Sequence, residues 1–389
     1  MSLESTKVQE SRVGDRFADF VSQHRIWKNP LLIACMENEL ALSDYGFIIS
    51  QHFYYSRGFT RLLSALMVSC DNDKYRAELS HNLWEEAGEE DLENRHSNLL
   101  RKMLSRVFGI DNPDETKFND YTTNYFDNCL KYLISNDAIS SASFMGWGTE
   151  GIVERLYSIF FDGLVNLGVP EEELTYLSLH MECDDEHAEI IENIALDQCG
   201  PKLEYHADKI EQAIDKALSL RDSYFLAIYN DLNTMKLSGL VKSIKQPKLD
   251  IELPATLNHH ASLTQAEGVK LYSSDQQDEG IKFHVSRFDL GCEVMDPRLL
   301  EIAVGSRNEV HRHAHESIFY IVSGQGNIHI GDKSIEAKKG DIVYVPRWVS
   351  HYSENIGEEA LCIFAITDFG LTNHFPKNTN NSYRKNKNM

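Results

Sequence analysis

Residues 177–190 of this 389-residue chain read LSLHMECDDEHAEI, with His180, Asp184 and His187 spaced four and three residues apart. On an α-helix, positions i, i+4 and i+7 lie on one face, within roughly 60° of each other. The spacing therefore predicts three potential metal ligands that point the same way. An apolar stripe that would bury this face in a helical bundle is formed by Leu177, Leu179, Ile190, Ile191 and Ile194. Because the stretch is also rich in acidic residues, a solvated acidic face is the competing interpretation.

Helical periodicity extends from Arg12 to about Met235, with few strand-like alternations. Pro170 followed by three glutamates is a good helix start, because proline costs little in the first turn and carboxylates favour the positive end of the helix dipole. We predict an all-α domain over residues 12–235. Its helices are expected at about 13–24, from 29–30 onward, and at 43–68, 73–86, 92–107, 114–133, 140–167, 170–196 and 203–235.

The character of the sequence changes after Met235. Residues 236–254, KLSGLVKSIKQPKLDIELP, are locally basic and contain proline, which suggests a linker over 236–255. Short strand patterns divided by turn residues follow over 256–372 and predict an antiparallel β domain. Residues 373–389 are polar and rich in Asn and Lys, and we expect them to be disordered.

The overall composition excludes some functions. A formal net charge of -22 and the lack of a basic stripe argue against nucleic-acid binding. No signal-like apolar segment or run of membrane-span length occurs, so we expect a cytoplasmic protein without a membrane partner. The seven cysteines are scattered and form no C-x-x-C pair, which predicts reduced, mostly buried thiols.

Partners for the histidine–aspartate trio are found in residues 81–100, HNLWEEAGEEDLENRHSNLL. Glu86 precedes His96 by ten residues, and on one unbroken helix the two would point about 80° apart, so sharing a metal needs an interruption such as Gly88. Glu89 and Glu93 lie on the face of His96 without any kink and remain alternatives. Glu150 stands in the largely apolar stretch SFMGWGTEGIVERLY, where an unpaired carboxylate would be costly, so a metal or an ion pair is expected there.

This pattern resembles the haem-oxygenase-like di-iron oxidases and oxygenases, over roughly residues 12–235. The resemblance implies a helical bundle that holds two irons, with His180, Asp184 and His187 matching the late H-x-x-x-D-x-x-H motif. It makes Glu86 and His96 the expected pair from an early helix and Glu150 the middle carboxylate. The family usually has a further Glu on the first core helix, but residues 54–63 here read YYSRGFTRLL. Arg57 or Thr60 occupies that neighbourhood, and the nearest upstream residue of a ligand type is His52.

Residues 305–326, GSRNEVHRHAHESIFYIVSGQG, and 340–355, GDIVYVPRWVSHYSEN, resemble the two motifs of the cupin family. Trp348 replaces a usual glycine. The resemblance implies a small β-barrel, and because strand side chains alternate between faces, His311, His313, His315 and position 317 share the inward face. The usual fourth ligand, Glu or Gln, is replaced by Ser317, and Glu316 points to the other face. The expected metal ligands are His311, His313 and His351, with His315 as an additional candidate. Three facial histidines leave positions for a substrate and dioxygen.

The fold class that we predict is therefore multidomain, an all-α haem-oxygenase-like helical bundle followed by a cupin β-barrel. This combination resembles the streptozotocin-type N-nitrosourea-forming enzymes. The resemblance implies an oxygenase with two Fe(II) in the helical domain and one in the cupin, with O2 as co-substrate. We expect a small amine, guanidine or amino-acid-derived substrate, an external electron donor and a homodimer. The alternative is a non-catalytic metal- or ligand-binding cupin sensor with a degenerate helical domain.

Overall fold

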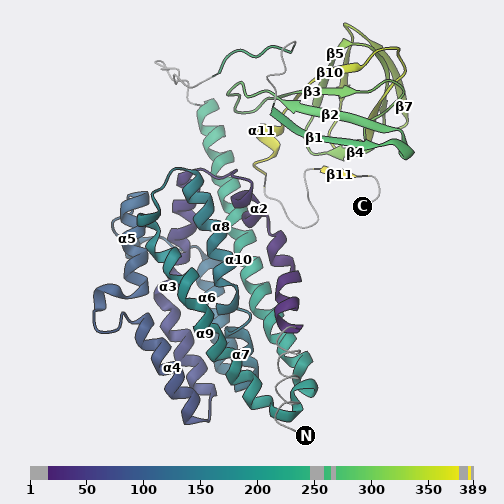
Figure 1. The fold of residues 1–389 in the computed structure, drawn as a ribbon. Helices are drawn as coiled ribbons and strands as arrows, with labels where there is room; N and C mark the ends of the chain where they lie inside the picture. Colours follow the sequence, from purple (N-terminus) through teal and green to yellow (C-terminus); the bar gives the residue numbers. More distant parts are fainter. Residues whose placement is uncertain (1–15, 246–257, 264–268, 376–383, 387–389) are drawn as a thin grey trace. The chain divides into compact units, whose positions relative to one another are not determined.

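The computed structural model describes residues 16–245, 258–263, 269–375 and 384–386, and within these it leaves out the side chains of 182–186, 243–245, 277 and 384–386. The chain divides into two compact units, Met1–Tyr229 and Asn230–Met389. Figure 1 shows the helices of the first unit and the strands of the second.

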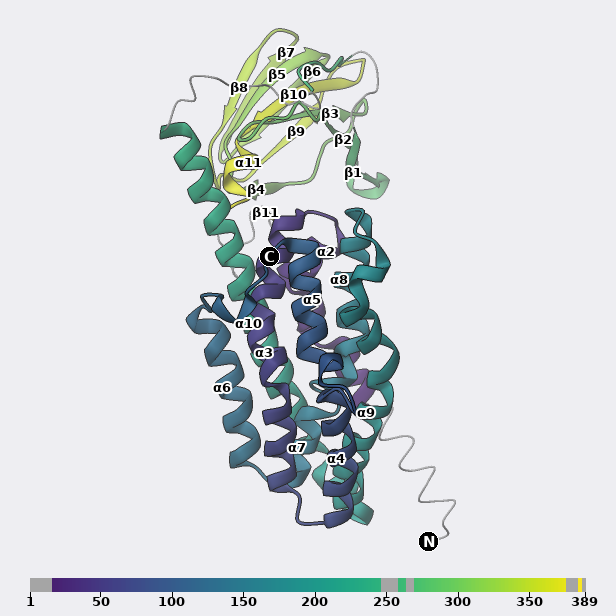
Figure 2. The same ribbon diagram turned by 90° about the vertical axis from the view of Figure 1, so that its left-hand side faces the viewer.

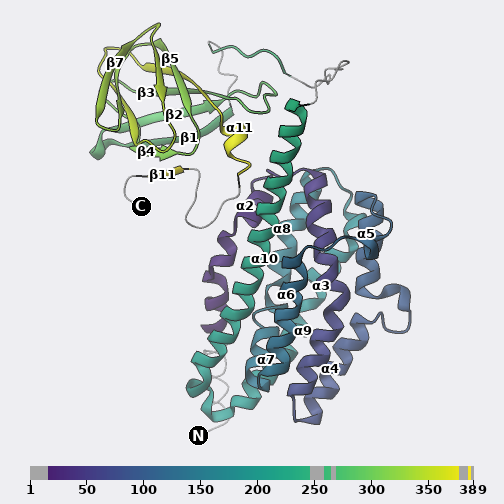
Figure 3. The same ribbon diagram turned by 180° about the vertical axis from the view of Figure 1, so that it is seen from behind.

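The first unit is a bundle of helices, as predicted (Figures 1 and 3). After a helical segment at residues 16–23, the α-helices are α2 (Pro30–Met36), α3 (Leu42–Ser69), α4 (Asp73–Glu86), α5 (His96–Phe108), α6 (Asp120–Ser135), α7 (Ala138–Met145), α8 (Val153–Asn166), α9 (Thr175–Cys199) and α10 (Leu203–Lys245). Short 3₁₀ turns are η1 (Arg25–Lys28), η2 (Leu92–Asn94), η3 (Pro113–Glu115), η4 (Glu150–Ile152), η5 (Glu171–Leu174) and η6 (Gly200–Lys202).

Two long helices organise the bundle. α3 contacts α4, α5, α6 and α7, and α9 packs against α7 and α8 as well as α4 and α5. The start of α3 is fixed because the Asp44 side chain accepts a hydrogen bond from the Ala41 N–H at 2.9 Å. The apolar faces of both helices are buried, with Phe53, Leu62 and Ile191 fully or almost fully inaccessible. The bundle therefore buries His180 and His187 on α9.

One predicted helix is broken in the structure. The prediction of a single helix over 140–167 was wrong, since α7 ends at Met145, a turn follows, and η4 leads into α8. The break occurs at glycines: the Gly146 N–H caps α7 by donating to the Ala142 carbonyl at 2.7 Å, and a Cβ at Gly148 would lie 2.5 Å from the Ala217 Cβ. As a result Glu150 lies in a tight turn inside the bundle, where it is 6% exposed.

The end of the helical region also differs from the expectation. α10 continues past Met235 to Lys245, so the first ten residues of the expected linker are helical. Leu240 and Val241 within them continue the apolar content of the helix, and the first proline comes only at 247, outside the described residues. Along the described part of the chain, no helix combines the length and apolarity that a membrane crossing requires.

The second unit is a β-barrel of two antiparallel sheets (Figure 2). One sheet has the order β1-β2-β3-β10-β5-β8 and the other β11-β4-β9-β6-β7. The strands are β1 (Val269–Gln276), β2 (Ile281–Arg287), β3 (Asp296–Ile302), β4 (His311–His313), β5 (Ser317–Ser323), β6 (Gln325–Ile330), β7 (Lys333–Lys338), β8 (Ile342–Val345), β9 (His351–Asn355), β10 (Leu361–Thr367) and β11 (Arg384–Asn386), with η7 (Gln277–Glu279) and α11 (Phe369–Thr372).

Alternating burial along these strands produces the core between the sheets, which includes Phe283, Ile302, Ile321 and Ile363. The end of the chain departs from the predicted disorder at two described places, because residues 373–375 form hydrogen-bonded turns after α11 and Arg384–Asn386 pair with β4 as a short antiparallel strand. Strand pairing uses backbone groups, so a polar segment without apolar residues can form it. The described cysteines are free, as the composition indicated.

Candidate metal centres

The helical unit brings together three ligand-type side chains from three helices. Glu86 ends α4, His96 begins α5 and His180 lies on α9. Glu86 Oε1 is 3.0 Å from His96 Nδ1, which is 3.1 Å from His180 Nε2. Ligands about 2.1 Å from a metal at right angles would be about 3.0 Å apart. All three residues are buried, at 7–8% exposure, so the arrangement fits one metal ion.

Glu86 differs clearly from the two alternative acids. Gly88, with a φ of 91°, and the turn after it break the helix between Glu86 and His96, as their pairing required. Burial raises the pKa of Glu86, but the hydrogen bond and charge of His96 outweigh it, and the pKa is lowered on balance. Glu89 and Glu93 are exposed, and Glu93 accepts a hydrogen bond from Asn98. The geometry therefore favours Glu86 as the ligand.

His187 is buried on α9 and contacts an acid that the sequence analysis did not select. Its Nε2 lies 2.6 Å from Glu85 Oε2, and the same carboxylate is 3.3 Å from His81 Nδ1. The signal for Glu85 was present, since His81 and Glu85 are four residues apart on one helix. Asp184, the remaining member of the predicted trio, lies outside the described side chains.

Glu150 shares a cavity with this cluster. The cavity is also lined by Glu86, His180, Tyr176 and Arg221. Burial raises the pKa of Glu150 to about 8, with the charge of Glu86 acting in the same direction and Arg221 against it. An acid held in this way gains a favourable partner when a cation enters the cavity.

The cavity wall formed by α3 has no carboxylate among the described residues, in agreement with the sequence. Ser56 lines it and accepts a hydrogen bond from the Tyr176 hydroxyl at 3.1 Å. Arg57 points away and pairs with Asp114 at 3.0 Å, and Thr60 is not among the lining residues. Neither residue therefore takes the place of the family's additional Glu.

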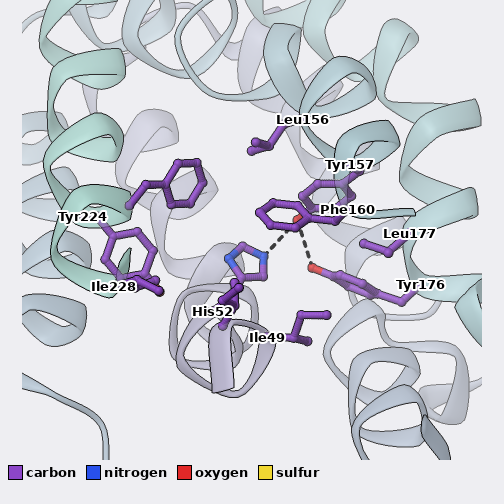
Figure 4. A pocket seen from close by; sticks show the side chains of 11 residues that line it. Ile49, His52, Leu156, Tyr157, Phe160, Tyr176, Leu177, Tyr224 and Ile228 are labelled. Carbon is purple, nitrogen blue, oxygen red and sulfur yellow. Dashed lines mark hydrogen bonds between the residues drawn. The ribbon is translucent and has the colours of Figure 1, made fainter. Parts of the chain in front are cut away.

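His52 lines a second, largely apolar cavity, which shares Tyr157 and Tyr176 with the first. Figure 4 shows His52, Tyr157 and Tyr176 linked by hydrogen bonds, with 2.9 Å from His52 Nε2 to the Tyr157 hydroxyl and 3.2 Å between the two hydroxyls. Burial lowers the pKa of His52 to about 3, and Arg221 and His180 act in the same direction. His52 is thus a neutral neighbour of the cluster.

The barrel presents the second cluster, which consists of His311 and His313 from β4 and His351 from β9. One ligand atom from each lies within 4.8 Å of the others, and all three residues are buried. Each Nδ1–H donates to a backbone carbonyl: His311 to Glu309 at 2.8 Å, His313 to His315 at 2.8 Å and His351 to Val349 at 2.9 Å. A neutral ring of this tautomer carries its lone pair on Nε2, the state that a metal needs.

The surroundings of this triad include His315, Ser317, Glu316 and Trp348. His315 is buried and stacks on His313 with ring centroids 3.6 Å apart, and Ser317 is buried with no hydrogen-bond partner for Oγ among the described residues. Glu316 faces outward and contacts Tyr344 and Arg347, as the strand parity predicted. Trp348 adopts a φ of 59°, the left-handed conformation that a glycine would favour, and donates its N–H to the His313 carbonyl.

Both donor sets suit iron. Mixed carboxylate and imidazole ligands, and a facial set of three imidazoles, are ligand sets of Fe(II). In the barrel the backbone carbonyls also orient the rings in advance. In the helical unit a backbone carbonyl likewise orients the His180 ring, whose Nδ1–H donates to the Tyr176 carbonyl at 2.7 Å.

Comparison with known families agrees with the two units. The family model described as an iron-containing redox enzyme matches residues 47–222, and that of the cupin domain matches residues 298–367. The helical unit is thus similar to the iron-containing redox enzymes over these residues, and the barrel is similar to cupin domains.

Two curated relatives share shorter stretches. An uncharacterized protein of Methanocaldococcus jannaschii is 40% identical over 67 residues, which cover 17% of this chain and 54% of the relative. An uncharacterized protein of Streptomyces coelicolor is 29% identical over 65 residues, covering 17% and 62%. The chain therefore spans between 54% and 62% of the length of these relatives.

Similar solved structures include a cupin domain of Schizosaccharomyces pombe Cnp3, with 17% identity and a TM-score of 0.22 over 25% of this chain and 68% of that one. A salicylate 1,2-dioxygenase from Pseudaminobacter salicylatoxidans has 13% identity and a TM-score of 0.25 over 28% and 31%. A cupin-2 domain from Rhodospirillum rubrum has 18% identity and a TM-score of 0.25 over 28% and 76%. Likenesses at this level carry no information about the reaction.

Proposed function

We propose that this protein is an iron-dependent, O2-activating oxygenase or oxidase that acts on a small amine, guanidine or amino-acid-derived substrate. The observation that carries the proposal is the presence of two buried clusters of ligand-type side chains on one chain, Glu86–His96–His180 and His311–His313–His351. Buried polar groups of this kind are costly unless a ligand or ion pairs with them.

In the helical domain, six residues would hold two Fe(II): Glu86, His96, Glu150, His180, Asp184 and His187. Bound iron would supply the electrons that reduce dioxygen, with an external donor restoring them. The protein orients the cluster through the bond from His180 to the Tyr176 carbonyl. Tyr157 and Tyr176 form an aromatic wall of the cavity and limit its access to water.

In the cupin, His311, His313 and His351 would hold a single Fe(II) with positions left for substrate. The resemblance to the streptozotocin-type enzymes supports a division of labour, in which the helical domain oxygenates a substrate nitrogen and the cupin rearranges or cleaves the product. Ser317 in place of a carboxylate keeps this ligand set neutral, which favours binding of an anionic or chelating product over a site with a fourth, charged ligand.

The test uses the full-length protein reconstituted anaerobically with Fe(II), with bound iron counted per chain. Oxygen uptake and products are then followed with candidate amines, guanidines and amino acids. His96→Ala should abolish all product formation, whereas His351→Ala should abolish only the later step and release the intermediate. Bound iron without substrate-dependent oxygen uptake would instead support the non-catalytic metal-binding alternative.

A further inference from the structure

Arg221, on α10, is the cation among the charged residues that line the helical cavity with Glu86, Glu150 and His180. Arg221 is buried, with only 3% of its surface exposed. Arginine is rarely buried to this degree unless an acid pairs with it, because removing a charge from water is costly. Nothing in the local sequence around Arg221 separates it from a surface arginine.

Aromatic side chains hold Arg221 in place. Nη2 donates a hydrogen bond to the Tyr55 hydroxyl at 3.2 Å, and the guanidinium carbon lies 5.2 Å from the ring centre of Tyr55 and 5.9 Å from that of Tyr125. Burial raises the pKa of both phenols, so they are neutral at physiological pH. These contacts orient the guanidinium and attract it weakly, but they leave its charge uncompensated.

Within the described residues, no carboxylate lies at ion-pair distance from Arg221, and its Nε has no hydrogen-bond partner. Glu150 is an acid in the same cavity, and the charge of Arg221 acts on its pKa. Under the proposed function, however, Glu150 is an iron ligand whose negative charge is directed to the metal. The positive charge of Arg221 and its Nε–H can therefore bind another group.

We infer that the substrate of the helical domain carries a carboxylate, and that Arg221 binds it. This inference rests on the proposed function of that cavity. The planar guanidinium matches a carboxylate through two parallel N–H donors, and the unpartnered Nε supplies one of them. Glu86 and His180 line the same cavity as Arg221, so the nitrogen of a short amino or guanidino acid held by Arg221 would face the cluster to which these two residues belong. Among the proposed substrates, acids are thereby selected over simple amines.

The experiment compares 4-guanidinobutanoate with its primary amide, which has the same shape without the negative charge. Both are titrated calorimetrically, without oxygen, into the full-length Fe(II)-loaded protein. The acid should bind at least about 30-fold more tightly than the amide, and Arg221→Met should remove about the same factor from the acid alone. Tyr55→Phe, which deletes only the orienting hydroxyl, should weaken binding of the acid by about 3- to 10-fold.

Arg61→Met is the matched control, because Arg61 also contacts an aromatic ring, Phe126, but is exposed and does not line the cavity. It should bind the acid like the unchanged protein, and circular dichroism should show that all variants fold. No binding of the acid, equal binding of acid and amide, or unchanged binding in Arg221→Met would each overturn the inference. If Arg221→Met instead loses iron while the acid still binds, Arg221 positions Glu150 and the inference is wrong.

Oxygen uptake, measured in parallel, separates this inference from the proposed function. Arg221-dependent binding of the acid without any oxygen uptake would leave the inference standing and contradict the oxygenase proposal. Oxygen uptake with uncharged amines that is unaffected by Arg221→Met would support the oxygenase and overturn the role of Arg221.

Discussion

Glu86 is distinguished from its acidic neighbours by burial, because it is 8% exposed and contacts His96, whereas Glu89 and Glu93 are exposed. We predict that Glu86→Gln lowers the affinity of the helical domain for Fe(II) by more than about 10-fold, since an amide cannot supply the negative charge. Anaerobic iron titration of the full-length protein measures this. Glu89→Gln and Glu93→Gln are matched controls that should bind iron normally. If iron affinity fell in only one of these controls, the glutamate changed in that control would be the ligand instead of Glu86.

The residues of the sites differ in how far the sequence could predict them. His180 with His187, and His311 with His313, lie close in the sequence, where helical and strand periodicity place them on one face. Tyr55 and Arg221 reach the helical site from separate helices, so only the packed bundle shows that they meet. Their roles depend on a long-range contact that no local pattern contains.

Among the helices, α8 approaches α3 closely at Gly163, where an added Cβ would lie 1.9 Å from the Tyr45 hydroxyl. We predict that Gly163→Ala lowers the free energy of unfolding by about 1–3 kcal/mol, because overpacking exceeds the gain of up to about 1 kcal/mol in helix propensity. Urea unfolding followed by circular dichroism checks this. Gly239→Ala on α10, where no atom lies within 4 Å of the added Cβ, should stabilise the helix by about 0.5–1 kcal/mol. Equal effects of the two changes would refute the packing explanation.

Most helices and the cupin strands could be predicted because their apolar periodicity is strong. The break between α7 and α8 was not predicted, because the apolar residues around it continue a helical pattern, although Gly146, Gly148 and Gly151 interrupt it. What favours the break is the close approach of Gly148 to Ala217, almost seventy residues later in the chain. The extension of α10 was missed because the basic charge and the proline of residues 236–254 suggested a linker, whereas the helix continues to Lys245.

At the scale of the whole molecule, each metal cluster lies within a single unit, and none of the described ligands comes from the other. We therefore predict that the two sites load independently. His351→Ala should remove the cupin iron and leave the affinity of the helical site unchanged within about 2-fold, whereas His180→Ala should do the reverse. Metal analysis with Mössbauer spectroscopy of the ⁵⁷Fe-loaded full-length variants distinguishes the two. Loss of both signals from either single variant would show that the sites depend on each other.

The carbonyls that hold the cupin histidines have an evolutionary consequence. Every amino acid carries the same peptide oxygen, so the bonds from His311, His313 and His351 to residues 309, 315 and 349 do not depend on which side chains stand there. Substitutions at positions 309 and 349 would therefore change the surroundings of the His311 and His351 rings while these rings keep their orientation. A substitution at position 315 would keep the carbonyl but would remove the ring that stacks on His313.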